Sequence, residues 1–176
     1  GKEGSVVSVE PMKYCIKMIT DLARSNGFKK PITVQAALSN RLGTAVLDYS
    51  GGVGFGSIVR DFGNNDTLKV KTETIDSIVD DLRLKRVDFI KLDIEGAELL
   101  ALEGAINTMQ KYRPTICLEC EDDRIYEITK FLEKFDYHAS VFDLKGDLVK
   151  LLIQDKSDFL PKNTNQVFYT PSREIE

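Results

Sequence analysis

The sequence predicts an α/β fold with a mainly parallel sheet that helices cover on both faces. Short apolar runs of strand length alternate with amphipathic segments of helix length along the chain. No internal repeat or low-complexity linker interrupts this alternation. Because 176 residues suffice to bury a sizeable core, we expect a single domain over residues 1–176.

The first half of the chain is expected to begin with a strand over residues 5–9, where β-branched side chains dominate. Pro11 suits the first position of a helix that continues to about Asn26, and Gly27 is a natural cap at its end. The further elements expected here are strands over 32–38, 44–49 and 68–71, the last two paired with each other, and a short helix that begins at Thr74.

The second half repeats the pattern of buried strands followed by amphipathic helices. Leu99, Leu102, Ile106 and Met109 recur at helical spacing, which predicts one helix from Ala97 to Tyr112. The other elements expected here are strands over 87–92 and 115–119, a helix with Ile125, Ile128, Leu132 and Phe135 on one face, and strands over 137–142, 148–153 and 166–170.

Composition and charge exclude several classes of function. A net charge of -4 and a pI near 5.2 give no electrostatic footprint for nucleic acid or for an anionic membrane surface. No apolar run approaches the roughly 20 residues that cross a bilayer. The odd number of cysteines, three, favours a reducing compartment, so we expect a cytoplasmic protein.

The potential metal and modification motifs are weak. Cys117 and Cys120 form a C-x-x-C pattern inside an apolar run, where residues three apart face opposite sides of a strand. We therefore expect no zinc site, and we interpret His138, the only histidine, as structural. Asn65 begins a glycosylation sequon by pattern only.

A glycine cluster over residues 51–56 mimics the loop that cradles a nucleotide cofactor. Only about 30 residues separate it from the strand over 87–92, which is too few for two βα units. We therefore expect a surface loop near the mouth of the active site, with a cofactor loop as the alternative.

The most informative stretch, residues 91–98, holds three carboxylates and a glycine between an expected strand and an expected helix. In open α/β sheets, ligands bind beyond the carboxyl ends of the strands. Asp93 and Glu95 are two residues apart, so in an extended segment they project to the same side. Gly96 permits a tight turn, and Glu98 falls in the first helical turn, where negative charge is favoured. The alternative is a solvated acidic loop that only starts a helix.

Several stretches, in order and spacing, resemble the FkbM-type methyltransferases. The most specific stretch runs from Asp88 to Glu98 and is extended by residues 102–105. The other matching stretches are 7–11, 35–40 with Gly43, 74–76, and 113–116 with Glu119. The resemblance implies a Rossmann-like class I methyltransferase sheet, mostly parallel with a C-terminal antiparallel strand.

The resemblance also implies a cofactor, S-adenosylmethionine, and residues that would hold it. Glu10 would bind the ribose hydroxyls, since one carboxylate can accept from both. Gln35, Ala36 and Ala37 would border the adenine, where small side chains leave room for the ring. Asp93 would lie near the methionine ammonium and the reacting centre.

The implied reaction is methyl transfer to an oxygen, usually a hydroxyl, of a small molecule, sugar or lipid. Asp93, Glu95 and Glu98 are the candidates for catalysis, with the last two holding the acceptor or taking its proton, and Glu119 is a weaker candidate. The same carboxylates could instead bind a divalent metal ion, which prefers oxygen ligands, although nothing requires one.

The family's first strand and its D-x-G-x-N-x-G loop have no counterpart in the sequence, which opens just before the second strand of the pattern. We therefore expect a fragment whose strands over 5–9 and 87–92 either pair directly or keep open edges, and which binds the cofactor weakly by itself. Two other functions stay open, a nucleotide-binding oxidoreductase on a related sheet and a non-catalytic binding domain.

Overall fold

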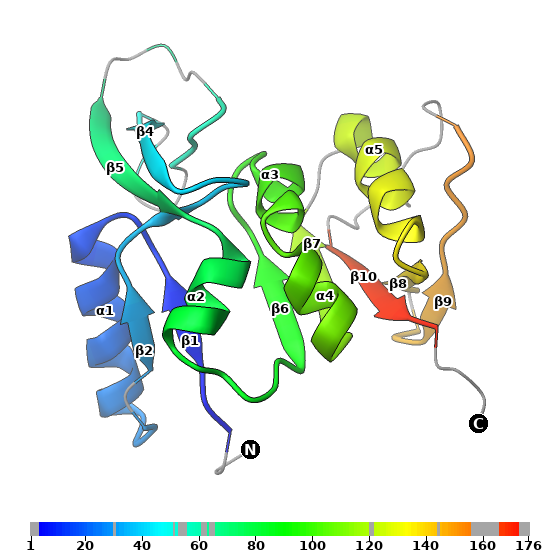
Figure 1. Ribbon diagram of the computed structural model, residues 1–176, viewed down its shortest axis with the longest axis horizontal. Coiled ribbons are helices and arrows are strands. Elements are labelled where there is room, and N and C mark those ends of the chain that lie inside the picture. Colours follow the sequence, from blue (N-terminus) through cyan, green and yellow to red (C-terminus); the bar gives the residue numbers. More distant parts are fainter. Residues whose placement is uncertain are drawn as a thin grey trace.

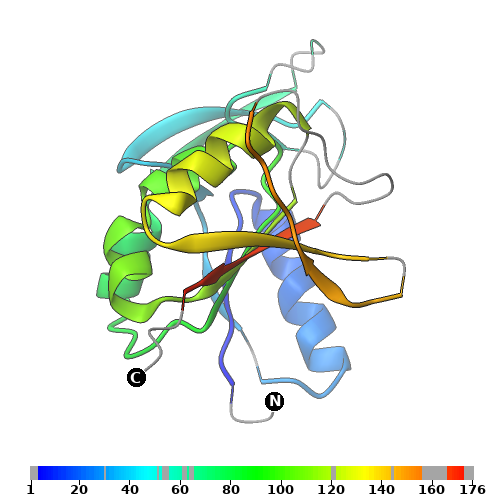
Figure 2. The same cartoon turned by 90° about the vertical axis from the view of Figure 1, so that its right-hand side faces the viewer.

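The computed structural model describes residues 4–29, 31–50, 52, 56–60, 63, 66–119, 122–143, 145–155 and 166–172. Strands and helices alternate along this part of the chain, so the predicted α/β class is confirmed. Helices lie on both sides of the strands, with the green and yellow helices on one side and the blue helix on the other (Figures 1 and 2).

The largest sheet has the strand order β6-β7-β10-β8-β9. Its strands are β6 (Phe89–Leu92), β7 (Thr115–Glu119), β8 (Tyr137–Phe142), β9 (Leu148–Lys150) and β10 (Gln166–Pro171). β6 and β7 are parallel, and β10 runs antiparallel to both β7 and β8, so β6, β7 and β8 share one direction. The predicted C-terminal antiparallel strand is thus present, and β9 adds a second one.

Three helices cover one face of this sheet: α3 (Glu98–Glu103), α4 (Ile106–Tyr112) and α5 (Asp122–Glu133). Their apolar side chains and those of the strands form the main core. Members with almost no exposed surface include Leu92, Leu102, Met109, Ile116, Leu118, Ile125, Ile128, Leu132, Val167 and Tyr169. Each such aliphatic side chain stabilises the fold by roughly 1.5–3 kcal/mol, so this sheet is the rigid base of the site.

A smaller parallel sheet pairs β1 (Val7–Val9) with β2 (Ile32–Val34). The connecting helix α1 (Lys13–Ser25) begins two residues later than predicted, because a Glu10 carboxylate oxygen accepts the Met12 N–H at 2.7 Å and turns the chain first. The predicted end is confirmed, since Gly27 adopts a φ of +70° just after the helix.

β1 and β6 lie beside each other and point the same way, yet the structure pairs neither with the other (Figure 1). Within the described chain, each is an edge strand. Of the two arrangements expected from the sequence, direct pairing or open edges, the structure has open edges. Phe89 on β6 is correspondingly 53% exposed.

A third sheet has the order β3-β5-β4, with β3 (Ala37–Leu38), β4 (Gly43–Asp48) and β5 (Thr67–Glu73). β4 and β5 pair as predicted, and they run antiparallel. The prediction of one strand over 32–38 is wrong, because the Ala36 N–H bonds back to the Val34 carbonyl and bends the chain. β2 and β3 therefore belong to different sheets.

The prediction of one helix over 97–112 is also wrong, because the helix breaks at Gly104 and Ala105. A side chain at Gly104 would overlap the Ser39 carbonyl oxygen. The loop that carries Ser39 therefore packs directly on the backbone of Gly104. After the break, the Asp76 carboxylate accepts from the N–H groups of Asn107 and Thr108 and caps α4 from outside. Asp76 belongs to helix α2 (Ile75–Asp81), which begins at Thr74 as predicted and has a capping box there.

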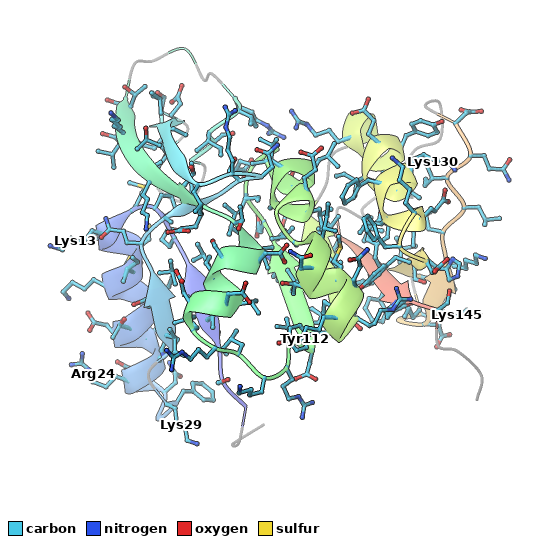
Figure 3. All side chains as sticks on the ribbon, viewed as in Figure 1. Lys13, Arg24, Lys29, Tyr112, Lys130 and Lys145 are labelled. Carbon is cyan, nitrogen blue, oxygen red and sulfur yellow. The ribbon has the colours of Figure 1, made fainter. Side chains whose placement is uncertain are left out.

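The labelled basic side chains are spread over the surface rather than gathered (Figure 3). Lys13 and Arg24 point outward from α1, whereas Lys145 lies at the opposite end of the molecule. No helix in the described ranges is long and apolar enough to cross a membrane.

Candidate active site

The chain leaves β6 through a sharp turn formed by residues 93–98, which we call the acid turn. Glu95 and Gly96 adopt φ angles of +51° and +98°, so the strand stops there and α3 begins at Glu98. Asp93 remains half-exposed and pairs with the Lys91 ammonium at 2.7 Å. Because of the left-handed residue, the predicted extended arrangement of Asp93 and Glu95 is wrong, although their charges still interact.

Glu98 braces the acid turn from inside. Its side chain is only 2% exposed, and one carboxylate oxygen accepts from the N–H groups of Gly96 at 3.1 Å and Ile94 at 3.3 Å. Its expected position in the first helical turn is confirmed. These bonds engage the carboxylate with backbone, so its role as a catalytic group stays a prediction.

Three residues that the sequence did not single out contact the acid turn. A guanidinium nitrogen of Arg60 lies 3.4 Å from the Glu95 carboxylate, and the Ser57 hydroxyl donates to the Glu95 carbonyl at 2.7 Å. Arg124, on α5, donates to the Gly96 carbonyl. The missing side chain of Gly96 makes room for both guanidiniums, since a Cβ there would lie 2.9 Å from Arg60 Nε and 3.2 Å from Arg124 Cζ.

The environment of Glu95 raises the pKa of its carboxyl group. Burial is the largest cause, and the charges of Asp93, Glu119 and Glu98 add to it, while Arg60 acts in the opposite direction. Glu119 contributes because it ends β7, the strand that pairs with β6 in parallel. A carboxylate with a raised pKa is a stronger base than a solvated one, as acid–base catalysis requires.

The Glu10 carboxylate lies at the carboxyl end of β1 and is also partly buried. Burial raises its pKa, and the Met12 N–H bonded to Oε1 opposes that rise. In the described part of the chain no donor is bonded to Oε2. Nearby, the Gln35 amide donates to the Pro11 carbonyl at 3.4 Å, which ties the ends of β1 and β2 together.

Ala36 and Ala37, the two small residues predicted to border a cofactor ring, follow Gln35. Their side chains are 1% and 6% exposed. Ala36 lies at the bend between β2 and β3, after the carboxyl end of β2, and Ala37 is the first residue of β3. Two of the parallel pairs, β1–β2 and β6–β7, thus end in or just before residues that the sequence predicted for the site.

The described end of the glycine cluster agrees with a loop at the edge of the site. Gly56 and Ser57 lie in the segment that connects β4 to β5. The Ser57 side chain contacts the acid turn directly, and its backbone bridges to Asp48. Because β4 is antiparallel to β5, Asp48 does not end a parallel strand as a cofactor loop would require. Gly51 and residues 53–55 lie outside the described residues.

Other residues weighed in the sequence lie away from this site or outside the description. The His138 ring nitrogen lies 2.7 Å from the Ser172 hydroxyl, in keeping with a structural role. Cys117 is buried on β7, and Cys120 and Asn65 fall outside the described residues. Among the residues that are described, no three His, Cys, Asp or Glu side chains are arranged to hold a metal ion.

A hollow of about 890 Å³ lies at the ends of β6 and β7 that are opposite to the acid turn, near the labelled Tyr112 in Figure 3. Its lining residues are Asp88, Tyr112, Arg113, Thr115, Asp136, Thr170, Pro171 and Ser172. It opens at the amino ends of β6 and β7, whereas ligands of open α/β sheets bind at the carboxyl ends. We therefore place the candidate site at the acid turn.

Comparisons with known proteins concern the fold and the family of this chain. A crystal structure of the methyltransferase FkbM from Methylobacillus flagellatus KT shares the fold, with a TM-score of 0.59 and 17% identity. The likeness covers 94% of this chain and 36% of that one, so this chain spans about a third of that protein's length. A comparison with curated proteins gave no match. The family model described as the methyltransferase FkbM domain matches residues 1–144, and the chain belongs to that family.

Proposed function

We propose that this chain carries the cofactor and acceptor site of an S-adenosylmethionine-dependent methyltransferase that methylates a hydroxyl group of a small molecule, sugar or lipid. The observation that carries the proposal is the acid turn. There, Glu95 presents a partly buried carboxyl group with a raised pKa just beyond the carboxyl end of β6. Membership of a methyltransferase domain family supports the choice of reaction.

The residues at the end of β1 fit the cofactor that we propose. Glu10 offers a half-buried carboxylate whose Oε2 has no bonded donor in the described chain, and ribose hydroxyls are donors that such an oxygen prefers. Ala36 and Ala37 follow the end of β2, the strand that pairs with β1, and we propose that these small, almost fully buried side chains form the wall against which the adenine lies. Asp93 offers a half-exposed negative charge for an ammonium group. When bound, the cofactor supplies an electrophilic methyl group on a positively charged sulfur.

On the acceptor side, the Glu95 carboxylate removes the hydroxyl proton while the acceptor oxygen forms its bond to the methyl carbon. The methyl group would come from the cofactor, whose sulfur would keep the electron pair of the carbon–sulfur bond. The protein contributes mainly by positioning the two reactants and by providing the base. Arg60 holds the Glu95 carboxylate in place through the contact at 3.4 Å.

The role of Glu10 leads to a prediction about cofactor affinity. Glu10→Gln should weaken S-adenosylmethionine binding by about 1.5–3 kcal/mol, because charge-assisted hydrogen bonds to the ribose are lost. This corresponds to roughly a 10- to 150-fold rise in Kd. Isothermal titration calorimetry measures the change, on the longest form of the protein that its gene encodes.

Glu133→Gln is the matched control, because Glu133 is a carboxylate at the end of α5 that pairs, among the described residues, with one neighbouring surface lysine, Lys130. It should leave the affinity unchanged. An unchanged affinity in Glu10→Gln as well would remove Glu10 from the cofactor site.

A further inference from the structure

Ser57 occupies a buried junction between the β4–β5 hairpin and the acid turn. Its side chain is 1% exposed, and its backbone forms a two-way bridge with Asp48, the last residue of β4, with both N···O distances at 2.9 Å. The position of Ser57 is therefore fixed by a sheet that does not include β6.

The hydroxyl group of Ser57 makes three hydrogen bonds. It donates to the Glu95 carbonyl at 2.7 Å and accepts from the N–H groups of Val59 at 3.2 Å and Arg60 at 3.0 Å. A serine hydroxyl has one donor and two acceptor sites, so its bonding capacity is filled. One side-chain oxygen thus joins the backbone that carries Arg60 to the backbone that carries Glu95.

Glu95 needs such support because its φ of +51° is costly for a residue with a side chain. A strained backbone conformation of this kind costs about 1–3 kcal/mol and persists only where its surroundings fix it. Three contacts do so: Ser57 on the Glu95 carbonyl, Arg124 on the Gly96 carbonyl, and Glu98 on the N–H groups of Ile94 and Gly96. Of the three residues, Ser57 alone also fixes the loop that carries Arg60.

We propose that Ser57 is a positioning residue for the methyl-transfer reaction, holding the Glu95 backbone and the Arg60 loop in one arrangement so that the guanidinium stays on the carboxylate. This inference rests on the proposed function, in which Glu95 is the base. Ser57 touches neither reactant and acts through Glu95. The segment between β4 and β5 thereby becomes part of the site through the Ser57 hydroxyl as well as through the charged Arg60 side chain.

The charged groups around Glu95 set its pKa, and a purely structural role of Ser57 would leave that pKa unchanged. Arg60 and Arg124 bring positive charge, whereas Asp93, Glu98 and Glu119 bring negative charge. If Ser57→Ala releases the Arg60 loop, the attraction that lowers the pKa of Glu95 weakens and the pKa rises further. The acid side of the rate profile then moves to higher pH, since the base must be ionised to accept a proton.

The experiment follows the carboxyl carbon of Glu95 by NMR over a pH series in glutamate-labelled protein, without cofactor or acceptor. Ser57→Ala should raise the midpoint of this titration. Thr72→Val is the matched control, because it removes another buried hydroxyl, which donates to the Arg41 carbonyl at 3.1 Å in the same hairpin region. It should leave the midpoint in place even if it costs similar stability in thermal unfolding.

Methyl transfer gives the second readout. Ser57→Ala should lower kcat by about 10- to 100-fold with little change in KM for S-adenosylmethionine, as expected when a base is misplaced. A Glu95 midpoint that is the same in Ser57→Ala, Thr72→Val and wild type would overturn the proposal. The proposed function fails separately, if Glu95→Gln retains full activity whatever the titration shows.

Discussion

Replacing Glu95 by Gln is expected to slow methyl transfer by about two to four orders of magnitude, because an amide cannot take the proton of the acceptor hydroxyl. Stability should change by less than about 1 kcal/mol, since the Arg60 contact that is weakened is a partly exposed pair at 3.4 Å. The measurement is the transfer of labelled methyl from S-adenosylmethionine to a panel of sugar, lipid and small-molecule hydroxyl acceptors. Urea unfolding checks the stability.

The pH dependence of methyl transfer tests the same role of Glu95. The carboxyl group works as a base only when ionised, so activity should fall as pH drops through a pKa that lies above the ordinary glutamate value. In Glu95→Gln this acid limb should disappear. Asp93→Asn should also slow the reaction, through the loss of charge near the reacting centre.

Asp88→Asn is the control for both substitutions, because Asp88 is an exposed carboxylate at the opposite end of β6 and pairs with Arg86. It should keep the wild-type rate. If Asp93→Asn and Glu95→Gln also keep that rate, the acid turn is not the catalytic centre.

Gly104→Ala is expected to destabilise the fold by about 2–3 kcal/mol, although alanine is the better helix former at most positions. The added methyl would overlap the Ser39 carbonyl oxygen and lie 3.1 Å from the Thr74 Cβ, and neither the backbone oxygen nor the helix cap can move away cheaply. Urea denaturation of wild type and variant, with the same m-value for both, measures the loss of unfolding free energy. The backbone conformation itself is permissive, with a φ of -84°.

Gly27→Ala provides the comparison, because Gly27 has a φ of +70° but no atom within 4 Å of a new Cβ. It should cost about 1 kcal/mol, from backbone strain alone. If Gly104→Ala costs no more than Gly27→Ala, the loop at Ser39 yields easily and the close packing does not determine the helix break.

Much of the fold could be predicted because local pattern and packing agree. Residues 137–142 alternate between buried and exposed and form a strand with the predicted bounds. The break inside the expected helix over 97–112 could not be predicted, since it depends on partners distant in sequence. Gly104 meets Ser39, and Asp76 caps the helix that follows. The bend inside the expected strand over 32–38 comes from a local backbone hydrogen bond, which no side-chain pattern marks.

The candidate site shows the same division. Asp93, Glu95 and Glu98 could be proposed as site residues because strand, glycine and helix signals are adjacent in the sequence. Ser57, Arg60 and Arg124 were missed because no local pattern relates them to residues more than 25 positions away. The only signal for the first two is that they follow the glycine cluster, which was expected at the edge of the site.

The open edges of β1 and β6 have a consequence for how the molecule opens. In the described chain no backbone hydrogen bonds connect the β1–β2 sheet to the sheet that contains β6, and α1 has no fully buried residue. The layer of α1, β1 and β2 should therefore exchange its amide hydrogens by local opening, at a free energy well below that of global unfolding. Glu10 belongs to this layer and the acid turn to the other. A ligand that contacts both would bind only when the two are docked, and by linkage it would slow amide exchange in α1 far from its own contacts.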